Sequence, residues 1–318
     1  MRGGMNSILE VHQLVKKFGD FTAVNGISFD IKEGEIFSLL GPNGAGKTTT
    51  LSVLSTLLEP TSGDATIDGY SVLTEPMGIR RCIGVVPQEI ALYDDLSARE
   101  NLAFWGQMYD LSGKVLKDRI DEVLQQIGLA DKANQRIKTY SGGMKRRVNI
   151  GVGLLHRPRL LFMDEPTVGI DPQSRRAILD AIKALNQQGM TVLYTTHYME
   201  EAQEISDRVG IIDHGELIAL GTQAELTRQV GENETLILHI NELDDPQLLC
   251  DRLQTLSGVV NAEQTNHDIN LVTVEASNIL AQVVSISNEM HIKIHSVDIH
   301  EPNLETVFLN LTGRALRD

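Results

Sequence analysis

Residues 41–50 read GPNGAGKTTT, and this stretch decides the fold of the chain. It satisfies the pattern G-x-x-x-x-G-K-[ST], in which glycines let backbone N–H groups converge on phosphates, a lysine neutralises them and a hydroxyl ligates Mg²⁺. An apolar run, SLLG (38–41), enters the loop, and a helical pattern, KTTTLSVLSTLL (47–58), leaves it. A glycine turn before an ordinary helix is the alternative, but the strand–loop–helix context favours a nucleotide-binding fold.

The second half of such a site is an acidic residue at the end of a neighbouring strand. LLFMDEP (160–166) supplies Asp164 as a metal ligand and Glu165 as a general base for an attacking water. Two solvated acids at a strand end are the alternative. TVLYTTH (191–197) ends on His197, which could donate to a γ-phosphate or serve only a structural purpose.

Two further residues are candidates with weaker support. Gln88, in VVPQE (85–89), could bridge a metal and an attacking water, or be an ordinary loop residue. Phe18, in VKKFGD (15–20), could stack on an adenine, because a flat apolar face suits a π-base, or be a core aromatic.

A second glycine turn lies at Ser141, Gly142 and Gly143, in TYSGGMKRRVNIGVGL (139–154). It offers a hydroxyl, backbone N–H groups and a helix dipole to an anion, but no lysine. We expect it to lie too far from Lys47 of its own chain to share a ligand. If two copies pack head to tail, each turn closes over the γ-phosphate of the other copy; a serine-capped helix start is the alternative.

The organisation of the chain indicates two domains. Up to about residue 222, short apolar strands alternate with helical patterns, which predicts a mainly parallel sheet with helices on its faces. Between about 90 and 155 only helical periodicity is present. QVGENE (229–234) marks a linker.

The remainder, 235–318, predicts an α+β domain with the order β-α-β-β-α-β, a ferredoxin-like arrangement. Its segments are TLILHI (235–240), DDPQLLCDRLQTL (244–256), GVVNAEQ (258–264), INLVTVE (269–275), NILAQVVSISNEM (278–290) and HIKIHSVDIH (291–300).

The composition argues against nucleic acid or anionic lipid as the main partner. The formal net charge is −15, from 28 Lys and Arg against 43 Asp and Glu, whereas both partners are bound through basic surfaces. Cys82 and Cys250 lie far apart without metal-ligand spacing, so we expect reduced thiols in the cytosol. The start, MRGGMNSILE, lacks the apolar core of a signal peptide, and no apolar run reaches the roughly 18–20 residues that span a bilayer. We expect a soluble protein whose membrane role needs a partner.

Six motifs, in this order, resemble those of the ATP-binding subunits of ABC transporters. They are GPNGAGKTT (41–49), PQ (87–88), YSGGM (140–144), LLFMDEP (160–166), GIDP (169–172) and TTH (195–197). The resemblance covers about residues 8–222. It implies an α/β P-loop ATPase cassette at 1–228, with a mainly parallel sheet, an antiparallel β edge and a helical subdomain at about 90–155, followed by the accessory domain at 235–318.

The resemblance also implies a role for each motif. Mg²⁺ would be held by Thr48, Gln88 and Asp164, while Glu165 would be the catalytic glutamate and His197 the switch histidine; Gln88 would also act in catalysis. Val168–Asp171 would be the D-loop. ATP would be contacted by Phe18, by the loop residues Gly41, Pro42, Asn43, Gly44, Ala45, Gly46, Lys47, Thr48 and Thr49, and by Ser141, Gly142 and Gly143 of the signature.

This sequence departs from the family pattern at three positions. Tyr140 and Met144 replace the first and last members of the common LSGGQ signature, and Phe18 stands where Tyr is usual. None of these changes removes a phosphate donor, so we expect ATP hydrolysis to be retained.

YSGGM, TVGIDPQSR (167–175) and PNLETVFLNLTGR (302–314) resemble the branch that energises drug, antibiotic or polysaccharide exporters of the ABC-2 type. That implies a homodimer around two ATP, bound to an ABC-2 type membrane permease on the inner face of the cell membrane, with LYDDLSARENLAFWG (92–106) as the contact. Two alternatives remain: a soluble ABC ATPase acting on ribosomes or DNA, and a regulatory module that uses ATP only to dimerise. A single cassette without heptads argues against the first, and intact Glu165 and His197 argue against the second.

Overall fold

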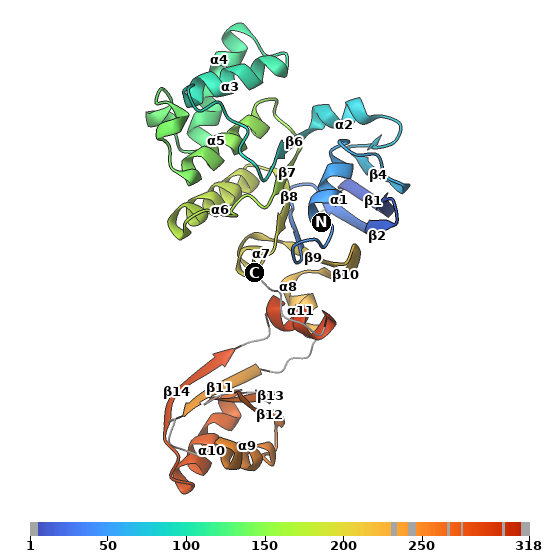
Figure 1. Cartoon of the computed structure of the whole chain (residues 1–318). Coiled ribbons are helices and arrows are strands. Elements are labelled where there is room, and N and C mark those ends of the chain that lie inside the picture. The colour runs from blue at the N-terminus through green and yellow to red at the C-terminus, as the bar shows by residue number, and fades with distance from the viewer. Residues whose placement is uncertain are drawn as a thin grey trace, which may run out of the picture. The chain divides into compact units, whose positions relative to one another are not determined.

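The computed structural model describes residues 6–229, 234–240, 246–265, 268–274, 276–300 and 303–312. The chain divides into two compact units, and the division falls between Thr222 and Gln223 (Figure 1). The expected cassette end at residue 228 lies six residues beyond this division, within α8 (Gln223–Gln229), which packs on α11 (Leu304–Thr312) in the second unit. Residues 230–233 of the expected linker lie outside the described residues.

The first unit contains both strands and helices. Its strands are β1 (Ser7–Phe18), β2 (Phe21–Lys32), β3 (Ile36–Leu40), β4 (Ser62–Ile67), β5 (Tyr70–Ser71), β6 (Ile83–Val86), β7 (Leu160–Asp164), β8 (Thr191–Thr196), β9 (Arg208–Asp213) and β10 (Glu216–Gly221). Its α-helices are α1 (Lys47–Leu54), α2 (Pro76–Cys82), α3 (Ala98–Met108), α4 (Gly113–Gln126), α5 (Gly142–Leu154), α6 (Pro172–Gln187) and α7 (Met199–Ile205). Two 3₁₀ turns, η1 (Ala130–Lys132) and η2 (Ile137–Thr139), precede α5.

A six-stranded sheet in the order β10-β9-β3-β8-β7-β6 carries the predicted phosphate site. The strands from β9 to β6 are parallel to their neighbours, and β10 adds the antiparallel edge. Residues of β3, β7 and β8 are buried throughout, as expected for parallel strands covered on both faces. Because β3, β7 and β8 are neighbours, their carboxyl ends bring the motifs that follow them to one edge of the sheet.

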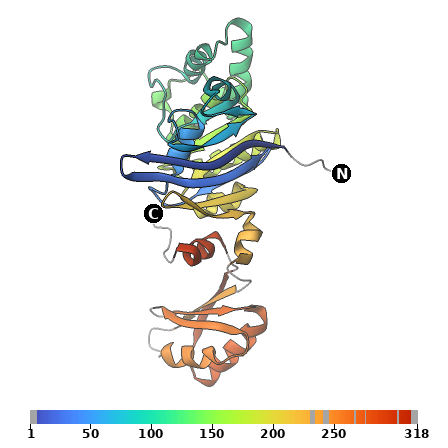
Figure 2. The ribbon, with the colours of Figure 1, turned by 90° about the vertical axis from the view of Figure 1, so that its right-hand side faces the viewer.

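The first 32 residues differ from the predicted alternation of strands and helices. β1 and β2 are long antiparallel strands that form a separate sheet, β2-β1-β4-β5, and Figure 2 shows them running side by side in dark blue. Their burial alternates along the strand, since one face packs on the core and the other faces solvent. Strands with one solvent-exposed face give a weaker hydrophobic signal in the sequence than the continuous apolar runs of the parallel sheet. For this reason β1 and β2 were not predicted from the sequence pattern.

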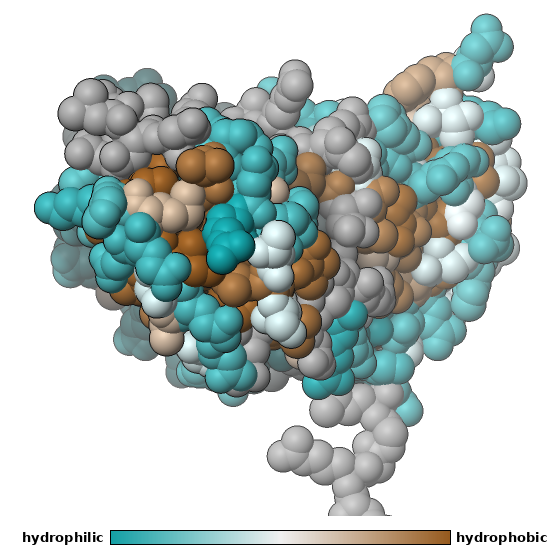
Figure 3. All heavy atoms as spheres, turned by 90° about the horizontal axis from the view of Figure 1, so that it is seen from below, coloured by the Kyte–Doolittle hydropathy of each residue, from teal (hydrophilic) through white to brown (hydrophobic). Residues whose placement is uncertain are grey.

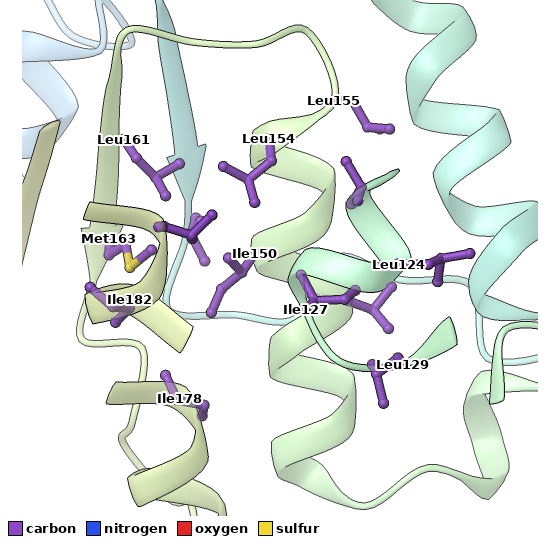
Figure 4. Packing of buried hydrophobic residues seen from close by; sticks show 14 of the residues in the cluster. Leu124, Ile127, Leu129, Ile150, Leu154, Leu155, Leu161, Met163, Ile178 and Ile182 are labelled. Atoms are coloured by element: carbon purple, nitrogen blue, oxygen red, sulfur yellow. The ribbon is translucent and has the colours of Figure 1, made fainter. Parts of the chain in front are cut away.

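The helices between residues 98 and 154 share one core with the parallel sheet. Leu154 and Ile150 of α5 lie between Met163 of β7 and the residues around Ile127, which follows α4 (Figure 4). Leu124 lies within the same cluster. The signature helix α5 is therefore fixed to the strand that ends at the acidic motif.

In the second unit the elements follow the order β11 (Glu234–Ile240), α9 (Pro246–Gln254), β12 (Val259–Thr265), β13 (Asp268–Thr273), α10 (Ala276–Glu289) and β14 (Ile294–His300), flanked by α8 and α11. This is the predicted order β-α-β-β-α-β. The four strands form an antiparallel sheet in the order β12-β13-β11-β14, with β12 and β13 paired as expected. Between β12 and β13, residues 266–267 lie outside the described residues.

Hydrophobic and hydrophilic residues are mixed over the surface that Figure 3 shows. Within the described ranges of the chain, no helix is both long enough and apolar enough to cross a membrane.

Candidate active site

The phosphate loop (residues 41–49) joins β3 to α1 and lines a pocket of about 330 Å³. Gly46 caps α1 in the left-handed region (φ 105°), and a Cβ there would lie 2.4 Å from the Ala23 carbonyl oxygen, so only glycine fits. The pocket is lined by Phe21, Ala23, Asn43, Gly44, Gly46, Lys47, Thr48, Thr49, Gln88 and Glu165. Residues from the loop, the PQ motif and the acidic motif therefore share one pocket.

Lys47 is held at the base of the loop. Its ammonium Nζ donates to the carbonyl oxygens of Gly41 at 2.6 Å and Pro42 at 2.9 Å, and it pairs with Glu165 Oε1 at 2.9 Å. The lysine is only 4% exposed, so its charge is largely removed from water. An ammonium in that position needs an anionic partner, and Glu165 supplies it.

Asp164 ends β7 beside the first turn of α1. Its Oδ1 accepts hydrogen bonds from Thr195 Oγ1 at 2.8 Å and Thr48 Oγ1 at 3.2 Å. Burial raises the pKa of the Asp164 carboxyl above its usual value, while the two hydroxyl groups pull it in the opposite direction.

The oxygen donors around Asp164 fit a magnesium ion. Mg²⁺ prefers oxygen ligands, keeps several waters, and is usually held by one or two protein groups plus substrate phosphates. Thr48 and Asp164 offer such a pair beside the phosphate loop, and Gln88 lines the same pocket. Among the described residues, no cluster of three or more His, Cys, Asp or Glu could hold a metal.

Glu165 occupies a strained backbone position at the centre of the site. Its φ of 43° lies in the left-handed region, which non-glycine residues adopt at a cost. The backbone N–H donates to Thr195 Oγ1 at 3.0 Å, and this bond fixes the turn. The carboxylate reaches Lys47 through Oε1 and His197 Nδ1 through Oε2, the latter at 3.2 Å. Glu165 and His197 are 6% and 8% exposed, so the two groups meet in a nearly dry environment.

Gln88 enters the pocket from the loop after β6, and α5 holds the backbone of that loop. Arg146 Nη2 donates to the Gln88 carbonyl oxygen at 2.5 Å, and Nη1 to that of Pro87 at 2.7 Å. The signature helix and the PQ loop are thus tied together by one buried guanidinium.

The candidate stacking aromatic has a neighbour that the sequence analysis missed. Phe18 is not among the residues that line the pocket; it is 48% exposed, and the Lys16 ammonium lies 5.2 Å from its ring centroid. Phe21, which does line the pocket, pairs directly with Phe18 across the β1–β2 turn. Directly paired residues lie on one face of a hairpin, so both rings stand on the same side.

The second glycine turn caps α5 and does not line the pocket of its own chain. Ser141 Oγ accepts a hydrogen bond from the Met144 N–H at 3.3 Å. Gly142 is exposed, and a Cβ there would lie 3.5 Å from Ile170 Cδ1, which is ordinary contact. Gly143 instead packs on α6, where a Cβ would lie 2.2 Å from Ser174 Cβ.

The sequence analysis also missed Thr195 and Arg146. Thr195 supports both acids of the site, and the signal that could have revealed it is a hydroxyl side chain in TVLYTT, two residues before His197. Arg146 carried no such signal, because an arginine in a helix is ordinarily solvated.

Comparisons with known proteins place these features in a family. A model of the ABC transporter family matches residues 24–168. The linearmycin resistance ATP-binding protein LnrL of Bacillus subtilis is 47% identical, over 98% of this chain and 100% of its own length. The doxorubicin resistance ATP-binding protein DrrA of Mycobacterium tuberculosis is 39% identical, over 92% of this chain and 89% of its own.

A solved structure extends the likeness to three dimensions. An ATP-binding cassette in a dimeric, post-hydrolysis state bound to ADP and Pi is 30% identical, with a TM-score of 0.60 over 67% of this chain and 98% of its own.

Proposed function

The chain belongs to the ATP-binding proteins of ABC transporters, and we propose that it hydrolyses ATP as a homodimer to drive a separate membrane permease that exports a drug or antibiotic. The observation that carries the catalytic part is the position of the buried Glu165 carboxylate, which lines the phosphate pocket and contacts both the Lys47 ammonium and the His197 imidazole.

Phosphate binding is assigned to the loop and to Lys47. Residues 43, 44 and 46–49 of the loop line the pocket, so their backbone N–H groups could bind phosphate, and α1 adds the positive end of its dipole. A γ-phosphate would compete with Glu165 for the Lys47 ammonium. Binding would therefore free the glutamate carboxylate for its role as base. Phe21 and its cross-strand neighbour Phe18 offer the apolar face for an adenine ring.

The metal is assigned to Thr48 and Asp164, with Gln88 lining the same pocket. Thr48 and Asp164 would hold Mg²⁺ beside the phosphate loop, where the ion would supply positive charge against the phosphates of ATP. In that state the Asp164 carboxylate would lie beside a cation, which stabilises its ionised form against the effect of burial.

Hydrolysis is assigned to Glu165 as the base that accepts a proton from the attacking water. His197 contacts the carboxylate through Nδ1, and when both ring nitrogens carry a proton, Nε2 could also donate to the γ-phosphate. Before ATP binds, Lys47 and His197 contact opposite oxygens of the Glu165 carboxylate and restrict its rotation; the His197 contact would remain when the γ-phosphate takes up Lys47. The dry surroundings strengthen each of these electrostatic contacts.

The second copy is assigned a direct part in the site. Ser141, Gly142 and Gly143 form an anion-binding helix start that does not line the pocket of its own chain. In a head-to-tail dimer it would complete the phosphate shell of the partner. A group supplied in trans is a recurrent way to stabilise phosphoryl-transfer charge. The dimeric structure of the related cassette supports this arrangement.

The membrane contact is assigned to residues 92–106 and the loop before them. Tyr93 is 48% exposed and Ile90 36% exposed, and Tyr93 packs edge-on against Phe104 of α3. This apolar surface follows Gln88 directly in the chain, so a change in the position of Gln88 at the ATP pocket would be transmitted to a permease docked there. The names of the relatives, resistance proteins for linearmycin and doxorubicin, support drug or antibiotic export at the inner face of the cell membrane.

The export proposal is tested by co-expressing the chain with the membrane protein encoded beside its gene. The two proteins should purify together in detergent, and reconstituted vesicles should accumulate drug when ATP is added. Lys47→Ala should still purify with the membrane protein but should not drive accumulation. A chain that purifies alone and leaves membranes unbound would overturn the exporter assignment without affecting the ATPase assignment.

A further inference from the structure

One buried carboxylate near the site has no part in the mechanism above. Glu201, on α7, is 2% exposed. Its Oε2 accepts hydrogen bonds from Tyr194 Oη at 2.7 Å and from Thr196 Oγ1 at 2.9 Å. Its Oε1 lies 3.5 Å from Arg175 Nε on α6, as an ion pair in which neither atom completes a hydrogen bond. A buried carboxylate is costly, so these contacts raise the question of what Glu201 holds in place.

Side chains along β8 alternate between the two faces of the sheet. Thr195 faces Asp164 and the Glu165 N–H, whereas Tyr194 and Thr196, one residue to either side, point to the opposite face and reach Glu201. Glu201 therefore anchors the carboxyl end of β8, directly before His197. The anchor lies on the face of the sheet away from the phosphate loop.

A second set of contacts leads directly to the histidine ring. Thr196 Oγ1 accepts a hydrogen bond from the Tyr198 N–H at 2.9 Å, in addition to its own bond to Glu201. The Tyr198 ring lies 4.1 Å, centroid to centroid, from the ring of His197. The Arg175 guanidinium, paired with Glu201, lies 4.4 Å from the Tyr198 ring centroid. Glu201 thus holds Tyr198 both through its backbone and through the cation over its ring.

We propose that Glu201 is a positioning residue that sets the orientation of the His197 imidazole against Glu165. Its charge retains Arg175 over Tyr198, and its Oε2 fixes Thr196, so the residues on either side of His197 cannot rotate independently. The inference rests on the assignment of His197 and Glu165 to hydrolysis under the proposed function.

The chain offers a matched control for this carboxylate. Glu204 lies one turn further along α7, and its Oε1 pairs with Arg176 and with Lys183 of α6, each at 2.8 Å. It therefore ties α7 to α6 as Glu201 does, but its ion pairs are with Arg176 and Lys183 and not with Tyr194, Thr196 or Tyr198. Any effect that arises from helix docking alone should appear in both variants.

The test compares Glu201→Gln with Glu204→Gln in the full-length protein. The first readout is the ring signal of His197 in the NMR spectrum of protein labelled with ¹³C in histidine, identified among the nine histidines by its loss in His197→Ala. The second readout is ATP turnover, with ATP affinity measured separately. We expect Glu201→Gln to shift the His197 signal and lower kcat about tenfold, the effect of roughly one lost polar contact, at unchanged ATP affinity. Glu204→Gln should do neither.

Each outcome decides a separate point. An unshifted His197 signal in Glu201→Gln overturns the inference, whatever happens to turnover, and so does an equal effect of Glu204→Gln. A shifted signal with normal turnover would overturn the assigned role of His197 in hydrolysis and leave the positioning contact standing. If Glu201→Gln fails to fold, Thr196→Val replaces it, because that change removes only the hydroxyl between Glu201 and Tyr198. It should shift the His197 signal in the same way, and an unmoved signal contradicts the proposal.

Discussion

Replacing Gly142 with aspartate places a carboxylate at the α5 helix start that is proposed to bind the γ-phosphate of the partner copy. The own-chain pocket does not include this residue, so the phosphate loop and Lys47 remain as they are. The perturbation therefore separates nucleotide binding by one chain from completion of the site by two. Gly142→Asp should abolish ATP-dependent dimerisation and lower turnover on the order of 10³-fold, the range seen when a group supplied in trans is lost.

The structure predicts that this variant folds normally. A Cβ at Gly142 meets only Ile170 Cδ1 at 3.5 Å, and the residue is exposed. An acidic side chain in the first turn of a helix gains about 0.3–1 kcal/mol from the dipole. Stability should therefore be equal to that of the parent or slightly higher, and the loss of activity would have to come from the dimer.

The assay is size-exclusion chromatography with light scattering in a Glu165→Gln background, which retains bound ATP. Two controls separate charge from shape. Gly142→Ala adds the same Cβ without the charge and should affect the dimer far less. Gly143→Ala should instead destabilise the fold, because its Cβ would lie 2.2 Å from Ser174 Cβ. A Gly142→Asp protein that still forms the ATP-dependent dimer would refute the reasoning and reduce this turn to an ordinary helix cap.

Three more predictions concern binding, stability and the domain boundary. Lys47→Ala should abolish high-affinity ATP binding, since it removes the cation of the phosphate pocket, and unchanged affinity in a calorimetric titration would contradict the assignment. Because the pKa of Asp164 is raised in the folded chain, the fold loses stability as pH rises through the range above the usual aspartate value. Asp164→Asn should therefore raise the free energy of unfolding at pH 7 by about 0.5–2 kcal/mol, as measured by thermal unfolding between pH 4 and 7. It should also abolish Mg²⁺-dependent hydrolysis in a turnover assay. A melting temperature below that of the parent protein at pH 7 would contradict the stability prediction. A chain ending at Thr222 should be more soluble than one ending at 234, because the longer piece keeps α8, with its buried Leu226, but lacks α11; the reverse order would place the boundary later.

The residues that meet at the phosphate pocket could largely be found from the sequence, and the family resemblance is confirmed by the relatives. Lys47 opens the helix that follows β3, Asp164 and Glu165 lie at the end of β7, and His197 follows β8; these parallel strands end at one edge of the sheet. Order along the chain was therefore enough to bring them together. The predicted cassette fold is confirmed by the strand order of the structure and by its similarity to the solved ATP-binding cassette.

Other features depend on contacts that sequence spacing does not encode. The antiparallel sheet of β1 and β2 presents one face to solvent, so its apolar pattern is diluted, and Phe21 was overlooked beside Phe18. The placement of α8 in the second unit depends on packing against α11, 75 or more residues further along the chain, which no local pattern records. Arg146 and Glu201 are buried charged residues, and their hydrogen-bond partners lie on other elements, which only the three-dimensional structure reveals.

The most direct test of the account is the rate of ATP hydrolysis by Glu165→Gln, measured alongside its affinity for Mg·ATP. Glutamine keeps the size of the side chain but cannot accept the proton of the attacking water. We expect retained Mg·ATP binding and a fall in turnover of about 10²–10⁴-fold, the usual cost of losing a positioned base. Near-normal hydrolysis by this variant would contradict it and move the base to another residue, with His197 the next candidate.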